Sequence, residues 1–205
     1  DERYVTVQGG DGARVRPTVR GAMVLAVAVA IPGASAAESP PQRGLTAAVE
    51  LARVYDAIFD ARFDEVPSLL VHACGPAPDD ACHLLDAVAL WWRIQLDPLD
   101  TARDDDFRAR VEAVLAATGA WTTREPARAE AWFYLGGAYG ARAQWRVLRG
   151  ERLAAARDGK RIKEALERAV ALDPGLADAY FGLGLYSYYA DVAPLLLPHI
   201  QGRPM

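Results

Sequence analysis

Two cysteines and two histidines form the cluster in this sequence whose side chains are best suited to redox or metal chemistry. They lie in the run HACGPAPDDACH, as His72, Cys74, Cys82 and His83. A disulfide between Cys74 and Cys82 is the favoured interpretation, because a short loop between the end of one helix and the start of the next can bring two cysteines within bridging distance. A pair of unbonded thiols is the alternative.

The same cluster fits a metal or haem site poorly. Adjacent residues such as Cys82 and His83 point in different directions on a helix, and the usual zinc-ligand spacings are absent. Haem attachment requires two residues between the cysteines, whereas seven separate Cys74 from Cys82. We therefore predict no metal and no cofactor, and keep a redox or metal-binding protein built on this cluster as an alternative function.

Catalytic motifs are not found in the sequence. There is no Gly-x-Ser-x-Gly, no phosphate-binding glycine loop and no dinucleotide-binding fingerprint. The acidic runs Asp79-Asp80 and Asp104-Asp105-Asp106 stand where helices are expected to begin, so we interpret them as N-terminal caps that complement the helix dipole. The chain is therefore predicted to have no catalytic residues and not to be an enzyme.

A basic segment, residues 140–163, stands out in a chain of formal net charge −4. Its arginines and lysines outnumber Glu151 and Asp158 by eight to two, a local charge of +6. A solvated face on long helices is the simplest interpretation. The functional one is a contact for an acidic protein surface or an anionic membrane, anchored by Trp145. Nucleic acid is not an expected partner, because the chain as a whole is acidic. The arginines that we assign to partner binding are Arg142, Arg146 and Arg149.

The first 36 residues have the order of a secretory signal peptide. Three arginines precede the apolar run Ala22–Ile31, which is followed by Pro32-Gly33 and the small residues Ala34-Ser35-Ala36. Ten apolar residues are too few for a membrane span, which needs roughly 20. We expect cleavage near Ala36 and export to the periplasm or medium, with 37–44 as a linker. A buried helix in a cytosolic protein is the alternative.

The rest of the chain carries the composition and periodicity of a helical domain. The 205 residues are 52% hydrophobic and 24% charged, enough to bury a core. Proline- and glycine-containing breakers separate helical patterns, and no run alternates as a strand would. The predicted fold class is all-α, with consecutive helices antiparallel. The seven predicted helices span 45–60, 64–74, 79–96, 103–121, 127–149, 151–172 and 177–191.

A repeat in the second half of the sequence indicates the architecture of the helices. The stretch AEAWFYLGGAY at 129–139 returns 48 residues later as ADAYFGLG at 177–184. With the spacing Trp132-x-x-Leu135-Gly136-x-x-Tyr139, the chain resembles the tetratricopeptide repeat family. The match is specific for 129–190 and only architectural for 45–126, where we expect degenerate hairpins. The resemblance implies stacked antiparallel helix hairpins, an α-solenoid, in which Gly136 and Gly184 allow close approach of a paired helix.

The interval of 48 residues is longer than the family period of about 34. The excess is close to four helical turns, which predicts one elongated hairpin turning at Gly150. Its second helix carries a seam of small and apolar residues, and the competing interpretation breaks that helix at Asp158-Gly159. The seam residues are Ala155, Gly159, Ile162, Leu166 and Ala169.

The resemblance also implies a function. First helices of such hairpins line a concave groove that holds a protein or peptide partner, and we expect a non-catalytic, exported scaffold of this kind. A peripheral membrane adaptor that uses 140–163 is a further alternative. The segment 127–205 holds one extended repeat and the start of an incomplete one, whose open end is a candidate for self-association. The predicted groove residues are Phe133, Gly137, Phe181, Leu185 and Tyr188.

Overall fold

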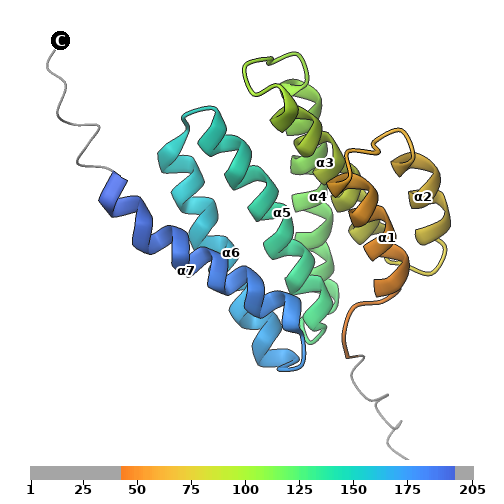
Figure 1. The fold of residues 1–205 in the computed structure, drawn as a ribbon. Helices are drawn as coiled ribbons and strands as arrows, with labels where there is room; N and C mark the ends of the chain where they lie inside the picture. The colour runs from red at the N-terminus through yellow and green to blue at the C-terminus, as the bar shows by residue number, and fades with distance from the viewer. Residues whose placement is uncertain (1–42, 197–205) are drawn as a thin grey trace, which may run out of the picture. The chain divides into compact units, whose positions relative to one another are not determined.

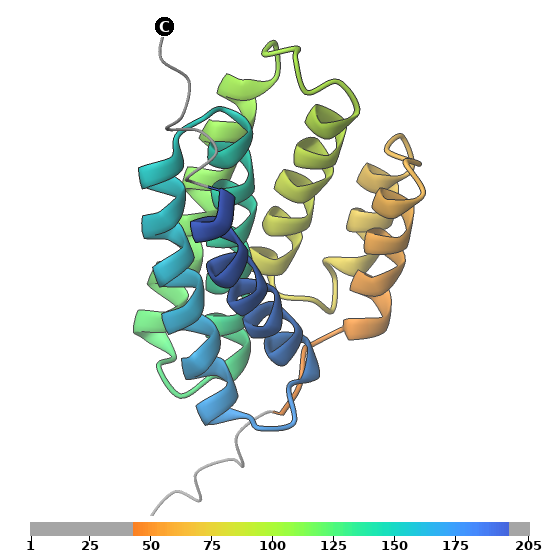
Figure 2. The same ribbon diagram turned by 60° about the vertical axis from the view of Figure 1, so that its left-hand side comes forward.

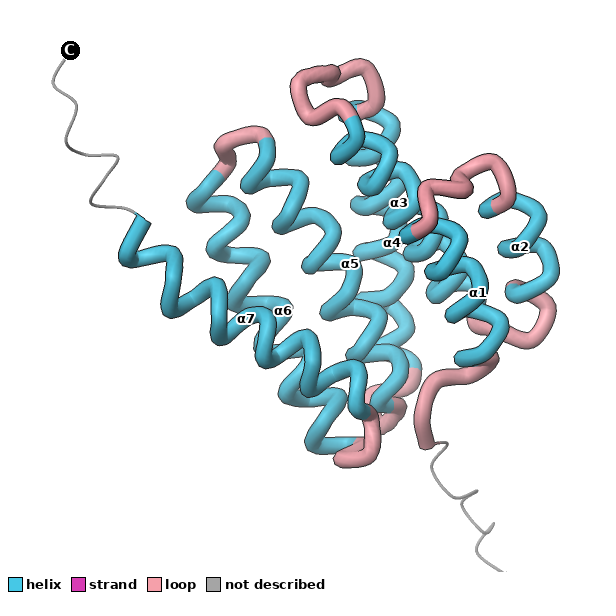
Figure 3. The backbone as a smooth tube through the Cα atoms, in the orientation of Figure 1, coloured by secondary structure: helices cyan, strands magenta, loops and turns pink. Residues whose placement is uncertain are grey.

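The computed structural model describes residues 43–196, and this part of the chain contains helices and no strand (Figures 1 and 3). The all-α prediction is thus confirmed for these residues, and each helix lies within a few residues of its predicted range. The predicted signal peptide and most of the linker fall outside the described residues. The helices are α1 Ala48–Phe59, α2 Val66–Ala73, α3 Asp79–Leu96, α4 Asp104–Arg124, α5 Ala129–Leu148, α6 Arg152–Leu172 and α7 Ala177–Leu196.

Each helix packs against the next one in the chain, and the views of Figures 1 and 2 show the neighbours running in alternating directions. Two additional contacts join helices that are not consecutive, α1 with α3 and α3 with α5. Helices α1, α3 and α5 therefore contact one another in series, and we call them the helix row. The contact between α5 and α6 is the most extensive of all.

The long hairpin of α5 and α6 turns at Gly150, as predicted. Gly150 has φ +76°, the left-handed conformation that glycine adopts without strain, and the backbone N–H of Glu151 donates to the carbonyl of Arg146 at 2.8 Å. Helix α6 continues without interruption through Asp158 and Gly159. The interpretation with a break at this point is therefore wrong, because Asp158 is held inside the hairpin by arginines of α5.

The acidic residues at helix starts do not cap in the way we expected. Asp79, Asp80 and Asp104 lie in first turns, where they complement the helix dipole, but neither α3 nor α4 has a side-chain hydrogen bond at its N-cap. The carboxylate of Asp104 faces inward instead. It accepts hydrogen bonds from Trp145 Nε1 at 3.1 Å and from Arg149 Nη2 at 2.9 Å, and so joins α4 to α5.

Leu166 of α6 fills the space between α5 and α7. A Cβ atom placed on Gly136 of α5 would lie 2.8 Å from Leu166 Cδ2, and one placed on Gly182 of α7 would lie 2.6 Å from Leu166 Cδ1. The role predicted for Gly136 is thus confirmed. Among the described residues, a Cβ atom on Gly184 would meet nothing within 4 Å, so the approach of a paired helix at this glycine stays a prediction. On α7, Gly182 makes the close approach to α6.

The segment before α1 crosses to the far end of the helix row. The backbone N–H of Gly44 donates to Asp173 Oδ2 at 2.8 Å, after the end of α6. Thr46 donates from its backbone N–H and its hydroxyl to the buried carboxylate of Glu130, at 2.7 and 2.9 Å. Leu45 packs against two clusters of core residues. We call residues 43–47 the N-terminal strap.

Candidate partner-binding surface

Three of the predicted groove residues form an exposed stripe on α7. Phe181, Leu185 and Tyr188 follow one another at intervals of four and three, which places them on one side of the helix. Their exposed fractions are 75%, 41% and 61%. Large apolar side chains usually lose more of their surface to the protein interior, so a stripe of three points to a contact with another molecule.

Helix α5 contributes the other two predicted residues, and they are less accessible. Phe133 is partly buried, with its ring centroid 5.3 Å from that of Tyr134. Gly137 is exposed, but a Cβ atom on it would lie 3.0 Å from Leu84 Cδ2 of α3. The glycine therefore allows α3 and α5 to pack closely, and it offers a partner only backbone. Figure 1 shows α7 and α1 on opposite sides of α5 in this view.

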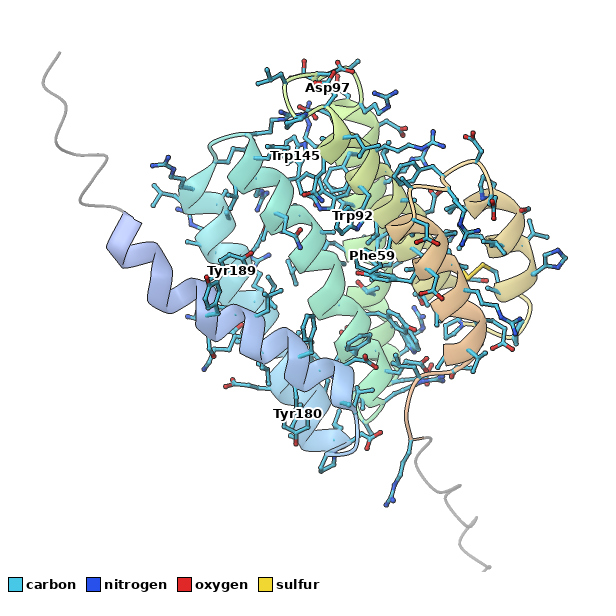
Figure 4. All side chains as sticks on the ribbon, in the orientation of Figure 1. Phe59, Trp92, Asp97, Trp145, Tyr180 and Tyr189 are labelled. Carbon is cyan, nitrogen blue, oxygen red and sulfur yellow. A yellow bond between two sulfur atoms is a disulfide. The ribbon has the colours of Figure 1, made fainter. Side chains whose placement is uncertain are left out.

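A second group of aromatic side chains, on α1 and α3, was missed by the sequence analysis. Tyr55 and Phe59 lie one turn apart on α1, with ring centroids at 4.8 Å, and the ring of Phe59 lies 5.1 Å from that of Trp92 on α3 (Figure 4). Tyr55 and Phe59 both remain exposed. Partial burial raises the pKa of the Tyr55 hydroxyl. The four-residue spacing of Tyr55 and Phe59 was the signal in the sequence.

We name these side chains together the aromatic surface. They come from the odd-numbered helices, those that form the row described above and α7. The members are Tyr55, Phe59, Trp92, Phe133, Gly137, Phe181, Leu185 and Tyr188.

Arg142 and Arg146, two of the predicted partner-binding arginines, are held by carboxylates of this chain. Arg142 donates from Nε and Nη2 to the two oxygens of Asp158, at 3.0 and 2.7 Å, and from Nη1 to Glu112 at 2.6 Å. Arg146 Nη1 donates to the same Asp158 at 2.6 Å. The Asp158 side chain is only 2% exposed, so these contacts fasten α5 to α6 inside the hairpin.

Arg149, the third of these arginines, fastens α5 to the loop between α3 and α4. Its guanidinium donates to the carbonyl oxygens of Pro98 and Asp100, at 2.6 and 3.1 Å, and to Asp104. Burial opposes the charged form of Asp104, but hydrogen bonds from Arg149 and Trp145 outweigh it and lower the pKa of this carboxyl. The arginine charges that we had expected to face a partner are thus largely occupied within the chain.

The membrane anchor expected in the basic segment is not on the surface. Trp145 is buried against Phe107, with ring centroids at 6.0 Å, and its indole N–H bonds Asp104. The exposed lysines are also partly neutralised, since Lys163 pairs with Glu167 at 2.9 Å and Lys160 approaches Glu164 at 3.9 Å. The structure therefore places Trp145 in the core and leaves the hairpin surface less basic than a count over 140–163 suggests.

Cys74 and Cys82 are joined in a disulfide that ties the end of α2 to the first turn of α3, with a Cα–Cα distance of 6.0 Å. A shallow apolar depression of about 300 Å³ lies beside the bond. Its lining includes Leu70, Val71 and His83. Within residues 43–196, no three histidine, cysteine or acidic side chains are grouped so that they could hold a metal ion.

None of the protein-family models, curated proteins or solved structures compared with this chain matches it. Among the described helices, none combines the length and the hydrophobicity needed to cross a membrane.

Proposed function

We propose that this protein is a non-catalytic scaffold of tetratricopeptide-like helix hairpins that binds a protein or peptide partner through the aromatic surface. The observation that carries the proposal is the exposed stripe of Phe181, Leu185 and Tyr188 on α7. Aromatic side chains contribute much of the binding energy at protein interfaces, because they bury a large area at a small cost in conformational entropy.

The arrangement of the helices supports the repeat part of the proposal. Each first helix of a hairpin contacts its own second helix, α1 with α2, α3 with α4 and α5 with α6. Second helices also contact the next first helix, and α1, α3 and α5 contact in series. In stacked hairpins such neighbour contacts form the core and leave one face of the first helices open.

The partner's chemistry follows from the residues available. The aromatic surface offers aromatic rings, the side chain of Leu185 and the exposed backbone of Gly137. A segment with an apolar face, helical or extended, fits such a surface, and the binding energy would come from buried apolar area. The disulfide between Cys74 and Cys82 supports export to an oxidising compartment as part of the same proposal.

Affinity capture with the 205-residue chain, followed by titration of the purified partner, tests the proposal. The Phe181→Ala/Tyr188→Ala variant should weaken binding by about 2 kcal/mol or more, roughly thirtyfold, while its circular dichroism stays helical. The matched control is Leu96→Ala/Leu99→Ala, which removes two exposed leucines from outside the aromatic surface. Equal loss of binding in both variants, or in neither, would exclude the aromatic surface as the site.

A further inference from the structure

The tryptophan side chains differ in whether their indole N–H has an acceptor. The chain has five tryptophans, and all of them lie in the described helices. In four of them the indole N–H donates to an oxygen of this chain, at 3.0 or 3.1 Å. The pairs are Trp91 with Gln144, Trp121 with Glu125, Trp132 with the carbonyl of Pro126, and Trp145 with Asp104.

Trp92 is the fifth, and its indole N–H is free. The nitrogen makes no hydrogen bond with a described residue and is not buried, so it stays open to a ligand. The ring itself is held in place, because it packs against two clusters of core residues. A partly buried tryptophan usually finds a partner for its N–H. A fixed ring with a free donor therefore points to an acceptor that another molecule supplies.

Two more aromatic rings lie beside this donor. The ring of Phe59 stands at 61° to that of Trp92, and the ring of Tyr55 stands at 65° to that of Phe59 (Figure 4). Phe59 is 57% exposed and Tyr55 39%. Because neighbouring rings meet edge to face, they form ridges and not one flat stack. We call Tyr55, Phe59 and Trp92 with its N–H the indole site.

A segment in the polyproline II conformation has the complementary chemistry. Such a segment has no internal hydrogen bonds, so its carbonyl oxygens are free to accept one from an indole N–H. Its pyrrolidine rings pack on exposed aromatic side chains. The interior of a partner helix offers no such acceptor, because its carbonyl groups are already bonded to N–H groups one turn further on.

We propose that the indole site binds a proline-rich segment of a partner protein in the polyproline II conformation. Trp92 Nε1 donates to a backbone carbonyl of the segment, and Phe59 and Tyr55 pack on its prolines. This inference rests on the proposed function, because it names the class of partner for the part of the aromatic surface that α1 and α3 contribute.

Neither end of the described chain leads toward the indole site. The N-terminal strap lies at the amino ends of α1 and α5, where Thr46 donates to Glu130. Phe59 is the last residue of α1, roughly 16 Å from its start at 1.5 Å per residue. At the other end of the chain, α7 packs on α6 and lies across α5 from α1 (Figure 1). A separate molecule is therefore the expected occupant.

The probe for the indole site is a fluorescein-labelled oligoproline peptide, whose binding to the 205-residue chain is followed by fluorescence anisotropy. Trp92→Phe keeps an aromatic ring but removes the N–H, and it should weaken binding about fivefold, as expected for one hydrogen bond. The matched control is Trp132→Phe, because the N–H of this partly buried tryptophan already donates to Pro126. The control should keep the affinity of the parent chain, and circular dichroism verifies that both variants stay helical.

NMR of the indole N–H groups observes the proposed hydrogen bond itself. The Trp92 signal, identified by its absence in Trp92→Phe, should exchange with water faster than the other four in the free chain. Added peptide should shift this signal and slow its exchange. An unshifted Trp92 signal overturns the proposal, and so does a dissociation constant weaker than about 1 mM. Equal affinity for a peptide with alanine in place of every proline also overturns it.

Two further results separate this proposal from its alternatives. Tighter peptide binding by Pro40→Ala/Pro41→Ala would overturn it in favour of this chain's own proline pair as the occupant. The capture experiment with Phe181→Ala/Tyr188→Ala does not use a proline peptide. A partner captured there, together with no binding of oligoproline, would overturn the proline-rich ligand and leave the proposed function supported.

Discussion

Asp158 shows how a single residue decides whether two long helices stay together. Its carboxylate lies inside the hairpin of α5 and α6 and accepts hydrogen bonds from both Arg142 and Arg146. Removing one member of a buried ion pair is costly, because the charges left behind have lost both their partner and their water. The arginines of α5 therefore depend on a residue that the sequence analysis counted as an acidic charge and weighed as part of a possible helix break.

Asp158→Asn should lower the free energy of unfolding by about 3 kcal/mol, because the buried Arg142 and the partly buried Arg146 lose the carboxylate that they share while the side-chain volume is kept. Urea denaturation followed by circular dichroism measures this change. The control is Glu164→Gln on the exposed side of α6, which should change stability by no more than about 0.5 kcal/mol. Similar small effects from both variants would contradict a stabilising role for the Asp158 cluster.

Two other carboxylates, those of Asp104 and Asp173, should make the free energy of unfolding depend on pH. Hydrogen bonds from the backbone N–H groups of Gly44 and Gly175 lower the pKa of Asp173. For Asp104, burial opposes the charged form, but hydrogen bonds from Arg149 and Trp145 outweigh it and lower the pKa. A carboxyl whose pKa is lower in the folded than in the unfolded chain stabilises the fold above its ordinary value of 3.8. This contribution is lost as the pH falls below that value.

The urea midpoint should therefore fall as the pH is lowered from about 5 to about 2. The asparagine side chain in Asp173→Asn does not take up a proton in this range. The urea midpoint of this variant should therefore fall less steeply with pH than that of the parent chain. Asp105→Asn is the comparison, since Asp105 is a largely exposed residue on the same helix as Asp104. A decline of equal slope in Asp173→Asn and the parent would argue against a contribution from Asp173.

At the scale of elements, Leu166 joins three helices, because its two methyl groups reach Gly136 on α5 and Gly182 on α7. Leu166→Ala should lower the free energy of unfolding by about 2–5 kcal/mol, since the cavity cannot close between two glycines that have no side chains to fill it. Chemical denaturation tests this value. Leu153→Ala, an exposed leucine on α6, should have a small effect, and an equally small effect of Leu166→Ala would contradict the packing described.

Helix α2 is the element whose position depends most on a covalent bond. It has eight residues, of which only Val66 and Ala73 are fully buried, and the disulfide joins its end to α3. Removing the bond with Cys74→Ser/Cys82→Ser should cost about 2–4 kcal/mol. Amide hydrogen exchange, measured in the variant and in the parent chain, should show that the substitution speeds up exchange more in α2 than in α6. Uniformly faster exchange over both helices would indicate that the disulfide stabilises the whole domain and not α2 in particular.

For the molecule as a whole, helix positions were predictable because breakers and hydrophobic periodicity are local properties of the sequence. The turn at Gly150 followed from the repeat interval together with the residue type. What a guanidinium contacts depends on which helices lie opposite, and this information is not local. For this reason Arg142 was expected at the surface and lies inside the hairpin.

The aromatic surface was predictable in part for the same reason. The repeat identified the stripe on α7, because α7 restates the sequence of α5. The first two hairpins lack the repeat signature, so Tyr55 and Phe59 could not be placed until α1 was seen against α3. Gly184 was assigned a neighbour from the repeat alone, and within residues 43–196 that neighbour is not present.

The N-terminal strap has a consequence for the order in which the chain folds. Its contact between Gly44 and Asp173 spans 129 positions, whereas the α5–α6 hairpin consists of local contacts. Contacts between distant positions form slowly, since a long loop must close before they stabilise anything. During synthesis the strap leaves the ribosome long before Asp173 exists. The contact of Gly44 with Asp173 is therefore among the last to form, because it must wait until the hairpin of α5 and α6 has been made.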